Sequence, residues 1–190
     1  MRNGILVVVS SPSGGGKTTV IRHLLKDKSL PFVFSVSMTT RAKRSREKDG
    51  KDYWFVSEDE FFEKVKSNEL VEYEKVHNYF YGTPKKPLEL WQNEGKVVLL
   101  DLDVNGALAI KRLYPDSSLA IFLKPKHPDV LKQRLLKRAT EDDRQLNVRM
   151  SRVEMEMRIG EALDYSVVND VLRKTVSEVI DIIKQHVQFK

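Results

Sequence analysis

The sequence contains no cysteine and only four histidines among its 190 residues. Without cysteine there is no disulfide framework and no thiolate metal ligand, and four scattered histidines do not predict a zinc site. Nowhere do 18 apolar residues follow one another, as a membrane-spanning helix requires. The apolar run Ile5–Val9 is too short for the core of a signal peptide. We therefore expect a cytoplasmic protein that is neither secreted nor membrane-spanning.

Glycine is scarce, with nine residues, yet three of them stand together at positions 14–16 within the stretch SSPSGGGKTT. Gly16, Lys17 and Thr18 fit the phosphate-loop template G-x-x-x-x-G-K-[ST], with Ser11 where the first glycine is expected. The pattern predicts backbone N–H groups facing a phosphate, a lysine charge on the β- and γ-phosphates, and a threonine hydroxyl for Mg²⁺. A glycine-rich turn with an accidental Lys-Thr pair is the alternative. The nucleotide-binding residues expected in this loop are Ser13, Gly14, Gly15, Gly16, Lys17, Thr18 and Thr19.

The net charge of +6 is concentrated in two segments. Residues 41–52 hold six Lys or Arg against three acids, and residues 132–152 hold seven against three. Two separate basic segments in a chain with a phosphate loop favour clamps for a polyphosphate over a continuous nucleic-acid stripe. Solvated surfaces are the alternative explanation of the same composition.

Expected strands and helices alternate along a chain of single-domain length that has no internal repeat or linker. The expected strands are 5–9, 32–37, 53–56, 70–76, 96–100, 118–123 and 165–169. The expected helices are 17–26, one that follows a capping box at Ser57–Glu60, 84–94, 105–113, 128–137, 146–163 and 175–187. This alternation predicts a parallel three-layer sheet that binds ligands at the carboxyl ends of its strands.

Two further patterns carry chemistry. Arg41 and Arg44 lie in a long polar loop and can aim both guanidinium forks at one anion, although a basic loop is also typical of disorder. Asp101 ends an apolar strand and suits the Walker-B role, holding Mg²⁺ through water, and Asp103 shares its face. An arginine-bearing mobile flap is predicted around residues 139–143, formed by Arg134, Arg138, Arg144, Arg149 and Arg152.

Taken together, these pieces closely resemble guanylate kinase over essentially the whole chain. The matching stretches are SSPSGGGKTT, SVSMTTRAKR, DGKDYWFVS, NYFYGT, VVLLDLDVNGA, RLLKRATEDD and DYSVVND. The resemblance implies an α/β P-loop NTPase fold, a three-layer parallel sheet with an inserted nucleotide-monophosphate-binding subdomain and a helical lid. It implies one domain with a core of residues 1–36, 95–132 and 157–190, a GMP-binding insertion 37–94 and a lid 133–156. The implied reaction is transfer of the γ-phosphoryl of ATP to GMP with Mg²⁺.

The resemblance also implies roles for single residues. The residues that would grip the GMP phosphate are Arg41, Arg44, Tyr53 and Tyr81. Those that would surround the guanine are Ser37, Glu72, Thr83 and Asp103. On the ATP side, Lys17 and the lid residues Arg138 and Arg149 would contact the transferred phosphoryl. Thr18 and Asp101 would hold Mg²⁺. Asn169 would lie near the adenine through backbone contacts. Guanine offers N1–H and N2–H donors that suit a carboxylate, and no general base is required because the nucleophile is a phosphate oxyanion.

Four positions depart from the usual pattern, namely Ser11 for glycine, Thr83 for serine, Ala139 for glycine and Asn105 for glutamine. Ser11 and Ala139 bear on loop geometry and lid flexibility, not on the type of reaction. One alternative is a non-catalytic guanylate-kinase-like binding module, which lacks an intact phosphate loop. The other is a P-loop kinase for another acceptor, such as a ribose bisphosphate, against which Tyr81, Glu72 and Ser37 argue. The expected partners are GMP, dGMP and ATP, with no nucleic acid and no membrane, in a monomer or homodimer.

Overall fold

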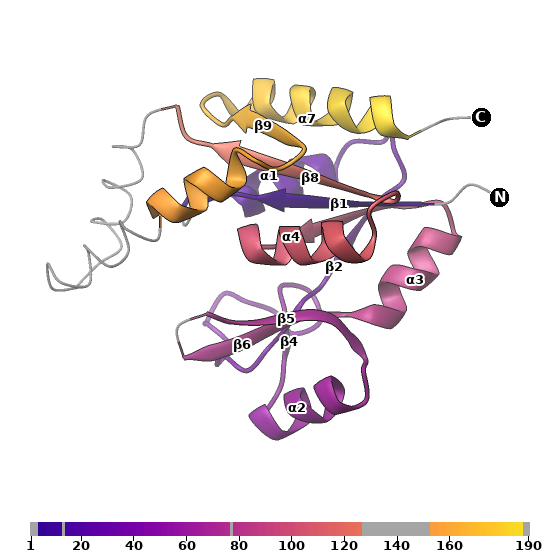
Figure 1. The fold of residues 1–190 in the computed structure, drawn as a ribbon, viewed down its shortest axis with the longest axis vertical. Helices are drawn as coiled ribbons and strands as arrows, with labels where there is room; N and C mark the ends of the chain where they lie inside the picture. The colour runs from indigo at the N-terminus through magenta and orange to yellow at the C-terminus, as the bar shows by residue number, and fades with distance from the viewer. Residues whose placement is uncertain (1–3, 13, 77, 127–152, 188–190) are drawn as a thin grey trace, which may run out of the picture.

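The computed structural model describes residues 4–12, 14–76, 78–126 and 153–187. Its centre is a five-stranded sheet in the order β2-β7-β1-β8-β9, in which every neighbouring pair is parallel (Figure 1). These strands are β1 Ile5–Ser10, β2 Phe32–Ser35, β7 Val97–Asp101, β8 Ser118–Lys124 and β9 Tyr165–Val168. The predicted parallel sheet is confirmed.

Helices cover both faces of this sheet and complete three layers. On one face lie α1, Lys17–Leu24, and α7, Leu172–His186. On the other face lie α3, Lys85–Asn93, and α4, Val104–Leu113, beside the helical residues 153–160. The carboxyl ends of all five strands therefore meet at one edge, where the phosphate loop follows β1.

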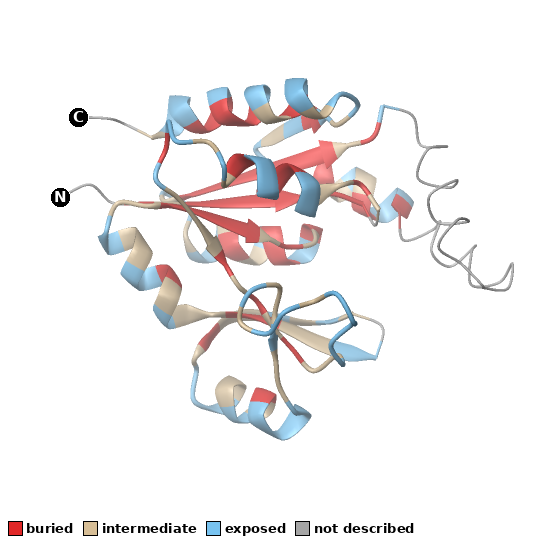
Figure 2. Ribbon diagram, turned by 180° about the vertical axis from the view of Figure 1, so that it is seen from behind, coloured by how far each residue is buried: buried red, intermediate tan, exposed pale blue. Residues whose placement is uncertain are grey.

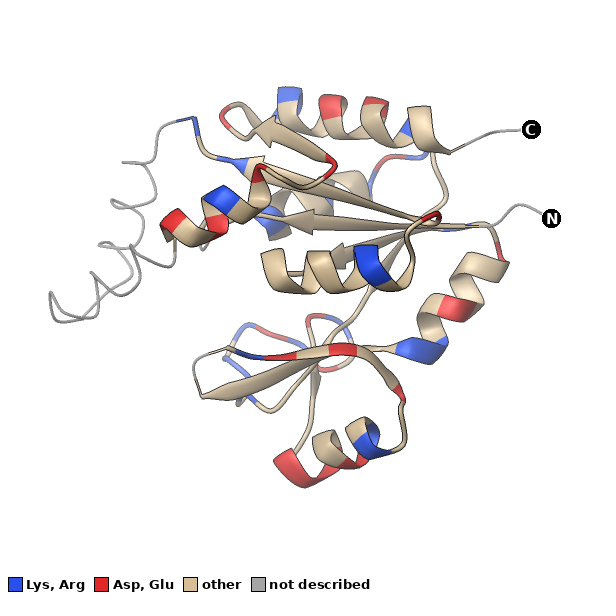
Figure 3. Ribbon diagram, in the orientation of Figure 1, with Lys and Arg blue, Asp and Glu red and all other residues tan. Residues whose placement is uncertain are grey.

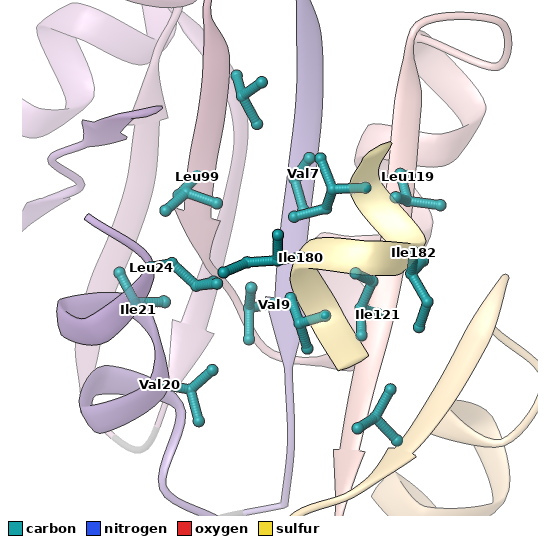
Figure 4. Packing of buried hydrophobic residues seen from close by; sticks show 14 of the residues in the cluster. Val7, Val9, Val20, Ile21, Leu24, Leu99, Leu119, Ile121, Ile180 and Ile182 are labelled. Carbon is teal, nitrogen blue, oxygen red and sulfur yellow. The ribbon is translucent and has the colours of Figure 1, made fainter. Parts of the chain in front are cut away.

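The central strand β1 reads as a continuous apolar run because both of its faces are covered. Val7 and Val9 belong to the cluster under α1 and α7, whereas Leu6 and Val8 belong to the cluster under α3 and α4. Figure 4 shows Ile180 of α7 projecting toward the side chains of α1 and β1. This packing fixes the two elements that flank the phosphate loop.

A second sheet, of four strands in the order β4-β3-β6-β5, is built between β2 and β7 and lies to one side of the main sheet (Figure 1). Its elements are β3 Met38–Thr39, β4 Trp54–Phe55, α2 Glu58–Lys66, β5 Leu70–Val76 and β6 Tyr79–Pro84. The pair β3–β4 is parallel, while β3–β6 and β5–β6 are antiparallel. Phe61 of α2 is fully buried against this sheet, with aromatic contacts to Tyr73 and Phe80.

Local signals set several element boundaries as predicted. The capping box of α2 is present, since Ser57 accepts from Glu60 N–H and the Glu60 carboxylate accepts from Ser57 N–H. The predicted strand 32–37 is wrong at its end, because β2 stops at Ser35 and the chain enters the second sheet. Helix α7 begins three residues earlier than predicted, after a Val171 N-cap that offers no side-chain signal. The predicted helix 128–137 and the start of 146–163 lie outside the described residues.

Candidate active site

The phosphate loop connects β1 to α1 and surrounds a pocket of about 200 Å³ lined by its own residues. Gly14 and Gly16 have φ angles of 79° and 94°, in the left-handed region that favours glycine. Gly16 is also the N-cap of α1 and contributes no side-chain cap, so the first N–H groups of the helix stay available to an anion. Two of the three glycines therefore have backbone conformations that let the chain turn tightly between β1 and α1.

Three side chains meet beside this pocket. The Thr18 hydroxyl donates to Asp101 Oδ2 at 3.2 Å, and Lys17 Nζ lies 3.9 Å from Asp101 Oδ1 and 3.4 Å from the Ser11 carbonyl oxygen. Burial raises the pKa of Asp101, while Lys17 and Thr18 act in the opposite direction. Asp101 reaches these residues because β7 pairs with β1 and ends at the same edge of the sheet.

Ser11 fits in place of the first template glycine because Gly15 leaves room for its side chain. A Cβ on residue 15 would lie 2.5 Å from Ser11 Oγ and 2.9 Å from the Pro12 carbonyl oxygen. The Ser11 hydroxyl donates to that same Pro12 carbonyl at 3.0 Å, and Ser11 is 2% exposed. The departure at position 11 is thus compensated inside the loop.

On the second sheet, Arg41 lies at the centre of a cluster with Tyr53 and Tyr81. Its Nε donates to the Tyr81 hydroxyl at 3.2 Å, and its guanidinium carbon lies 5.6 Å from the centre of the Tyr53 ring. The rings of Tyr53 and Tyr81 meet edge to face at 5.8 Å. Burial, together with the nearby charge of Asp101, raises the pKa of Tyr53 to about 12, so Tyr53 stays a hydroxyl donor.

The sequence did not predict a role for Glu47, which holds this cluster in place. Its two carboxylate oxygens accept from Arg41 Nη2 at 2.8 Å and Arg41 Nη1 at 3.0 Å, and it accepts from the Arg44 N–H at 2.8 Å. The hydrogen bond from Arg41 holds the pKa of Glu47 below its usual value, against the effect of burial. The Arg44 side chain is 75% exposed, with its guanidinium 3.9 Å from Glu47. Basic and acidic residues alternate only in the second part of this loop, from Arg46 to Asp52 (Figure 3). Glu47 is the first acid after four basic residues, and that position was the available signal.

The four residues predicted to surround the base occupy two sides of the gap between the sheets. Thr83 of β6 is fully buried and donates to Glu72 Oε1 of β5 at 2.5 Å. Burial raises the pKa of Glu72 to about 7, with a further contribution from the negative charge of Asp103. Asp103 caps α4 by accepting from Gly106 N–H at 3.0 Å, and Ser37 is 9% exposed at the start of the second sheet.

Polar contacts join the two sheets on either side of this gap. Asn105 of α4 donates to Glu74 of β5 at 2.9 Å. Arg22 of α1 forms an ion pair with Asp52, next to Tyr53, at 3.7 Å. These two contacts join helices of the main-sheet layers to β5 and to the segment directly before Tyr53.

Of the other predicted residues, Thr19 lines the loop pocket and Asn169 lies directly after β9. The Asn169 side chain contacts the phosphate loop, a contact that the sequence did not predict. Ser13, Arg138 and Arg149 lie outside the described residues. Among the described residues, no group of three His, Asp or Glu could bind a metal ion by itself.

Comparisons with known proteins agree on one family. The family model described as guanylate kinase matches residues 3–186. The chain is similar to the guanylate kinase of Lactobacillus johnsonii, with 45% identity over 97% of this chain and 91% of that protein. It is similar to the guanylate kinase of Thermotoga maritima, with 42% identity over 95% and 86% of the two chains. The crystal structure of guanylate kinase from Anaplasma phagocytophilum superposes with a TM-score of 0.84 and 32% identity, over 99% of this chain and 88% of that chain.

Proposed function

Since this chain belongs to the guanylate kinase family and transfers the γ-phosphoryl of ATP to GMP, we propose where on the molecule this transfer occurs. ATP binds with its phosphates in the loop pocket between β1 and α1. GMP binds on the second sheet, with its phosphate at the Arg41 cluster and its base at Glu72. The transferred group passes across the space that the two sites share.

On the ATP side, the backbone N–H groups of the loop receive the phosphates and Lys17 places a positive charge beside the β- and γ-phosphates. Thr18 and Asp101 suit Mg²⁺, because a hydroxyl and a carboxylate 3.2 Å apart are hard oxygen donors. Thr18 would hold the ion directly and Asp101 through water, while the substrate phosphates would supply further oxygen ligands. When bound, the ion supplies charge neutralisation on the phosphates. The loop residues in this role are Ser13, Gly14, Gly15, Gly16 and Thr19, with the adenine near the backbone of Asn169.

On the GMP side, Arg41, Arg44, Tyr53 and Tyr81 bind the phosphate. Glu47 keeps the Arg41 fork in one orientation, so little side-chain entropy is lost when the substrate arrives. Tyr53 and Tyr81 add hydroxyl donors from the same side.

The base is read by Glu72 with Thr83, Ser37 and Asp103. Ionised Glu72 accepts from guanine N1–H and N2–H, and the bond from Thr83 goes to only one of its two oxygens. Adenine has no N1–H, so bound AMP would leave a buried carboxylate without that donor.

The chemical step requires no general base, because a GMP phosphate oxygen is already an anion. Catalysis then consists of aligning two phosphates and stabilising the charge of the transferred group. Lys17 does so from the loop. We assign the same task to Arg138 and Arg149 of the lid, residues 133–156, which closes over the insertion 37–94 and the core.

The remaining parts of the proposal concern the setting. We propose a cytoplasmic enzyme, monomeric or homodimeric, that acts on GMP and dGMP and binds no nucleic acid. No helix in the described part of the chain is long and apolar enough to cross a membrane.

One observation carries the proposal, the meeting of Lys17, Thr18 and Asp101 beside an intact loop. A non-catalytic binding module does not require these three side chains, because it transfers no phosphoryl group. A coupled assay of ADP formation with ATP and a panel of acceptors tests the function, and we expect turnover with GMP far above that with AMP, CMP, UMP or ribose phosphates. Equal turnover with a ribose bisphosphate would contradict the proposal, as would no turnover with any acceptor.

A further inference from the structure

Asn169 stands directly after β9, yet its side chain reaches the phosphate loop at the other end of the sequence. Its Nδ2 donates to the Gly15 carbonyl oxygen at 2.7 Å. Its own backbone N–H donates to the Lys124 carbonyl at 2.7 Å, which anchors it to the end of β8. A side chain fixed to the main sheet therefore holds a carbonyl of the loop.

The opposite end of the Asn169 amide is also held. Thr175, on α7 and 1% exposed, has its hydroxyl 3.1 Å from Asn169 Oδ1, closer than to either neighbouring backbone carbonyl. A carbonyl oxygen such as that of Gly15 only accepts hydrogen bonds, so the amide must present its NH₂ group to the loop. The Thr175 hydroxyl supplies the matching donor to Oδ1. The orientation of the Asn169 side chain is thus determined at both ends.

Holding the Gly15 carbonyl also directs the next N–H group. In a planar trans peptide the C=O and the following N–H point in opposite directions. With the Gly15 carbonyl bonded to Asn169, the Gly16 N–H points away from Asn169. That N–H belongs to the set that receives phosphate oxygens in a loop of this type.

Gly16 shows how closely the two parts fit. A Cβ on residue 16 would lie 2.9 Å from Asn169 Nδ2. Asn169 therefore packs against the loop where residue 16 has no side chain, and the contact depends on that glycine as well as on the hydrogen bond.

We propose that Asn169 is a positioning residue of the phosphate loop, which acts through the Gly15–Gly16 peptide on the triphosphate of ATP rather than on the adenine base. The inference rests on the proposed function, in which this loop binds the ATP phosphates. It gives the Asn169 side chain a task separate from its backbone, and it makes Thr175 the residue that orients the amide.

The probe that separates the phosphates from the base is inorganic tripolyphosphate with Mg²⁺, which has no base. Isothermal titration calorimetry would measure the Kd of tripolyphosphate, of a non-hydrolysable ATP analogue and of GMP for wild type and Asn169→Ala. We expect about threefold to tenfold weaker binding of both tripolyphosphate and the ATP analogue, as for loss of one neutral hydrogen bond. Binding of GMP should stay unchanged.

Thr175 supplies the matched control pair. Thr175→Val removes the hydroxyl that orients the amide and should weaken tripolyphosphate binding in the same direction by a smaller factor. Thr175→Ser keeps the hydroxyl and should restore the wild-type value. This pair keeps the inference testable if Asn169→Ala proves unstable in a thermal melt.

Other outcomes overturn the inference. Weaker binding of the ATP analogue with unchanged tripolyphosphate binding would mean that Asn169 contacts the base. Equal losses for tripolyphosphate and GMP would mean a general structural role, and no loss at all would mean that the loop holds its shape without Asn169. Lys17→Ala distinguishes failure of the proposed function, since a loop that binds no triphosphate would leave Lys17→Ala with wild-type activity.

Discussion

The phosphate-loop side and the second-sheet side of the active site are built from different chemical groups. The loop presents backbone N–H groups and is held between β1 and α1, whose residues Val9, Val20 and Ile21 are at most 2% exposed. The second sheet presents side chains, and Figure 2 shows it mostly half-buried or exposed, whereas the three central strands of the main sheet, β7, β1 and β8, are mostly buried. Rigidity on the loop side therefore comes from the apolar core.

On the second sheet, polar side chains hold one another instead. Arg41 is paired with Glu47, and Glu72 is paired with Thr83. Each pair leaves a charged group half-buried at a set position, which a core of apolar residues could not provide. Burial in this arrangement raises the pKa of Glu72, and the position of each charged group depends on a single partner side chain.

This contrast separates how the two substrates are recognised, the phosphoryl donor ATP on the loop side and the phosphoryl acceptor GMP on the second sheet. Backbone N–H groups are the same for any triphosphate, so the loop side recognises phosphate without reading a base. A carboxylate such as that of Glu72 can distinguish bases by their donors, so the proposed function assigns base specificity mainly to the second sheet. The two sides should respond differently to substitution.

Lys17→Ala should have the largest effect, because Lys17 is the one described loop side chain with a positive charge, and the proposed function places that charge beside the transferred group. We expect kcat to fall by about 10³ or more, the scale of charge terms in phosphoryl transfer. The fold should persist, since Lys17 lies outside the apolar core. Steady-state kinetics with a thermal melt measure both quantities, and activity within about threefold of wild type would contradict the assignment of the loop.

Glu72→Gln should affect base choice next most strongly. In wild type we expect kcat/KM for GMP to exceed that for AMP by at least about 10³, below the range for sites that pair with a substrate group. Glutamine keeps the shape but loses the charge, so the GMP-to-AMP ratio should fall about 10-fold to 100-fold, as for a hydrogen bond to a charged group. Kinetics with both substrates and both proteins decide the matter. An unchanged ratio would assign specificity to Ser37, Thr83 and Asp103.

The pH dependence of GMP binding should change by about a factor of ten. With its pKa raised to about 7 by burial, Glu72 is largely protonated at pH 6 and largely ionised at pH 8. Only the ionised form makes charge-assisted hydrogen bonds to both guanine N1–H and N2–H, so KM for GMP should rise about tenfold from pH 8 to pH 6. Glu72→Gln is the control, because its remaining pH dependence reports the substrate phosphate alone. Identical profiles for the two proteins would rule out Glu72 as the titrating group.

The same carboxyl links stability to pH. Its pKa in the ligand-free folded protein lies above the ordinary value, so between about pH 4.5 and 7 the folded state binds a proton that the unfolded chain has released. Glu72 therefore lowers the free energy of unfolding as pH rises through that window. Bound GMP, which needs the ionised form, should remove this dependence.

Asn105→Ala should have the smallest effect, since it removes one exposed hydrogen bond between the two regions, 2.9 Å long, to Glu74. We expect a loss of about 0.5 to 1 kcal/mol in the free energy of unfolding. Urea unfolding measures the loss, and KM for GMP should change by less than about threefold. Asn105→Gln, which keeps the amide, serves as the control. A much larger change in KM would show that this contact sets the relative position of the two sheets.

Sequence patterns predicted the parts of the fold that depend on neighbouring residues. The Ser57–Glu60 capping box and strand β5 appear where expected, because cap chemistry and side-chain alternation are local. The transition from β2 to β3 was not predicted, because Phe32–Ser37 contains no proline or glycine that would end a strand and only pairing across the chain ends it.

In the candidate site, too, local patterns were predicted and contacts between residues distant in sequence were not. Template spacing identified Lys17 and Thr18, the end of an apolar strand identified Asp101, and the structure brings the three together. The roles of Glu47 and of the Asn169 amide depend on which residues lie near in space. Asn169 meets Gly15 from the other end of the chain, and no motif predicts that contact.

The central position of β1 also affects how the chain acquires its structure during synthesis. β1 pairs with β7 and β8, which begin at Val97 and Ser118, so the first strand made waits for more than half of the chain. Such distant pairings give a high contact order and slow folding, and they leave the apolar β1 exposed to aggregation and to chaperones meanwhile. The second sheet needs only residues 38–84. All strands of the second sheet are therefore present in the nascent chain before β1 of the main sheet has either of its neighbouring strands.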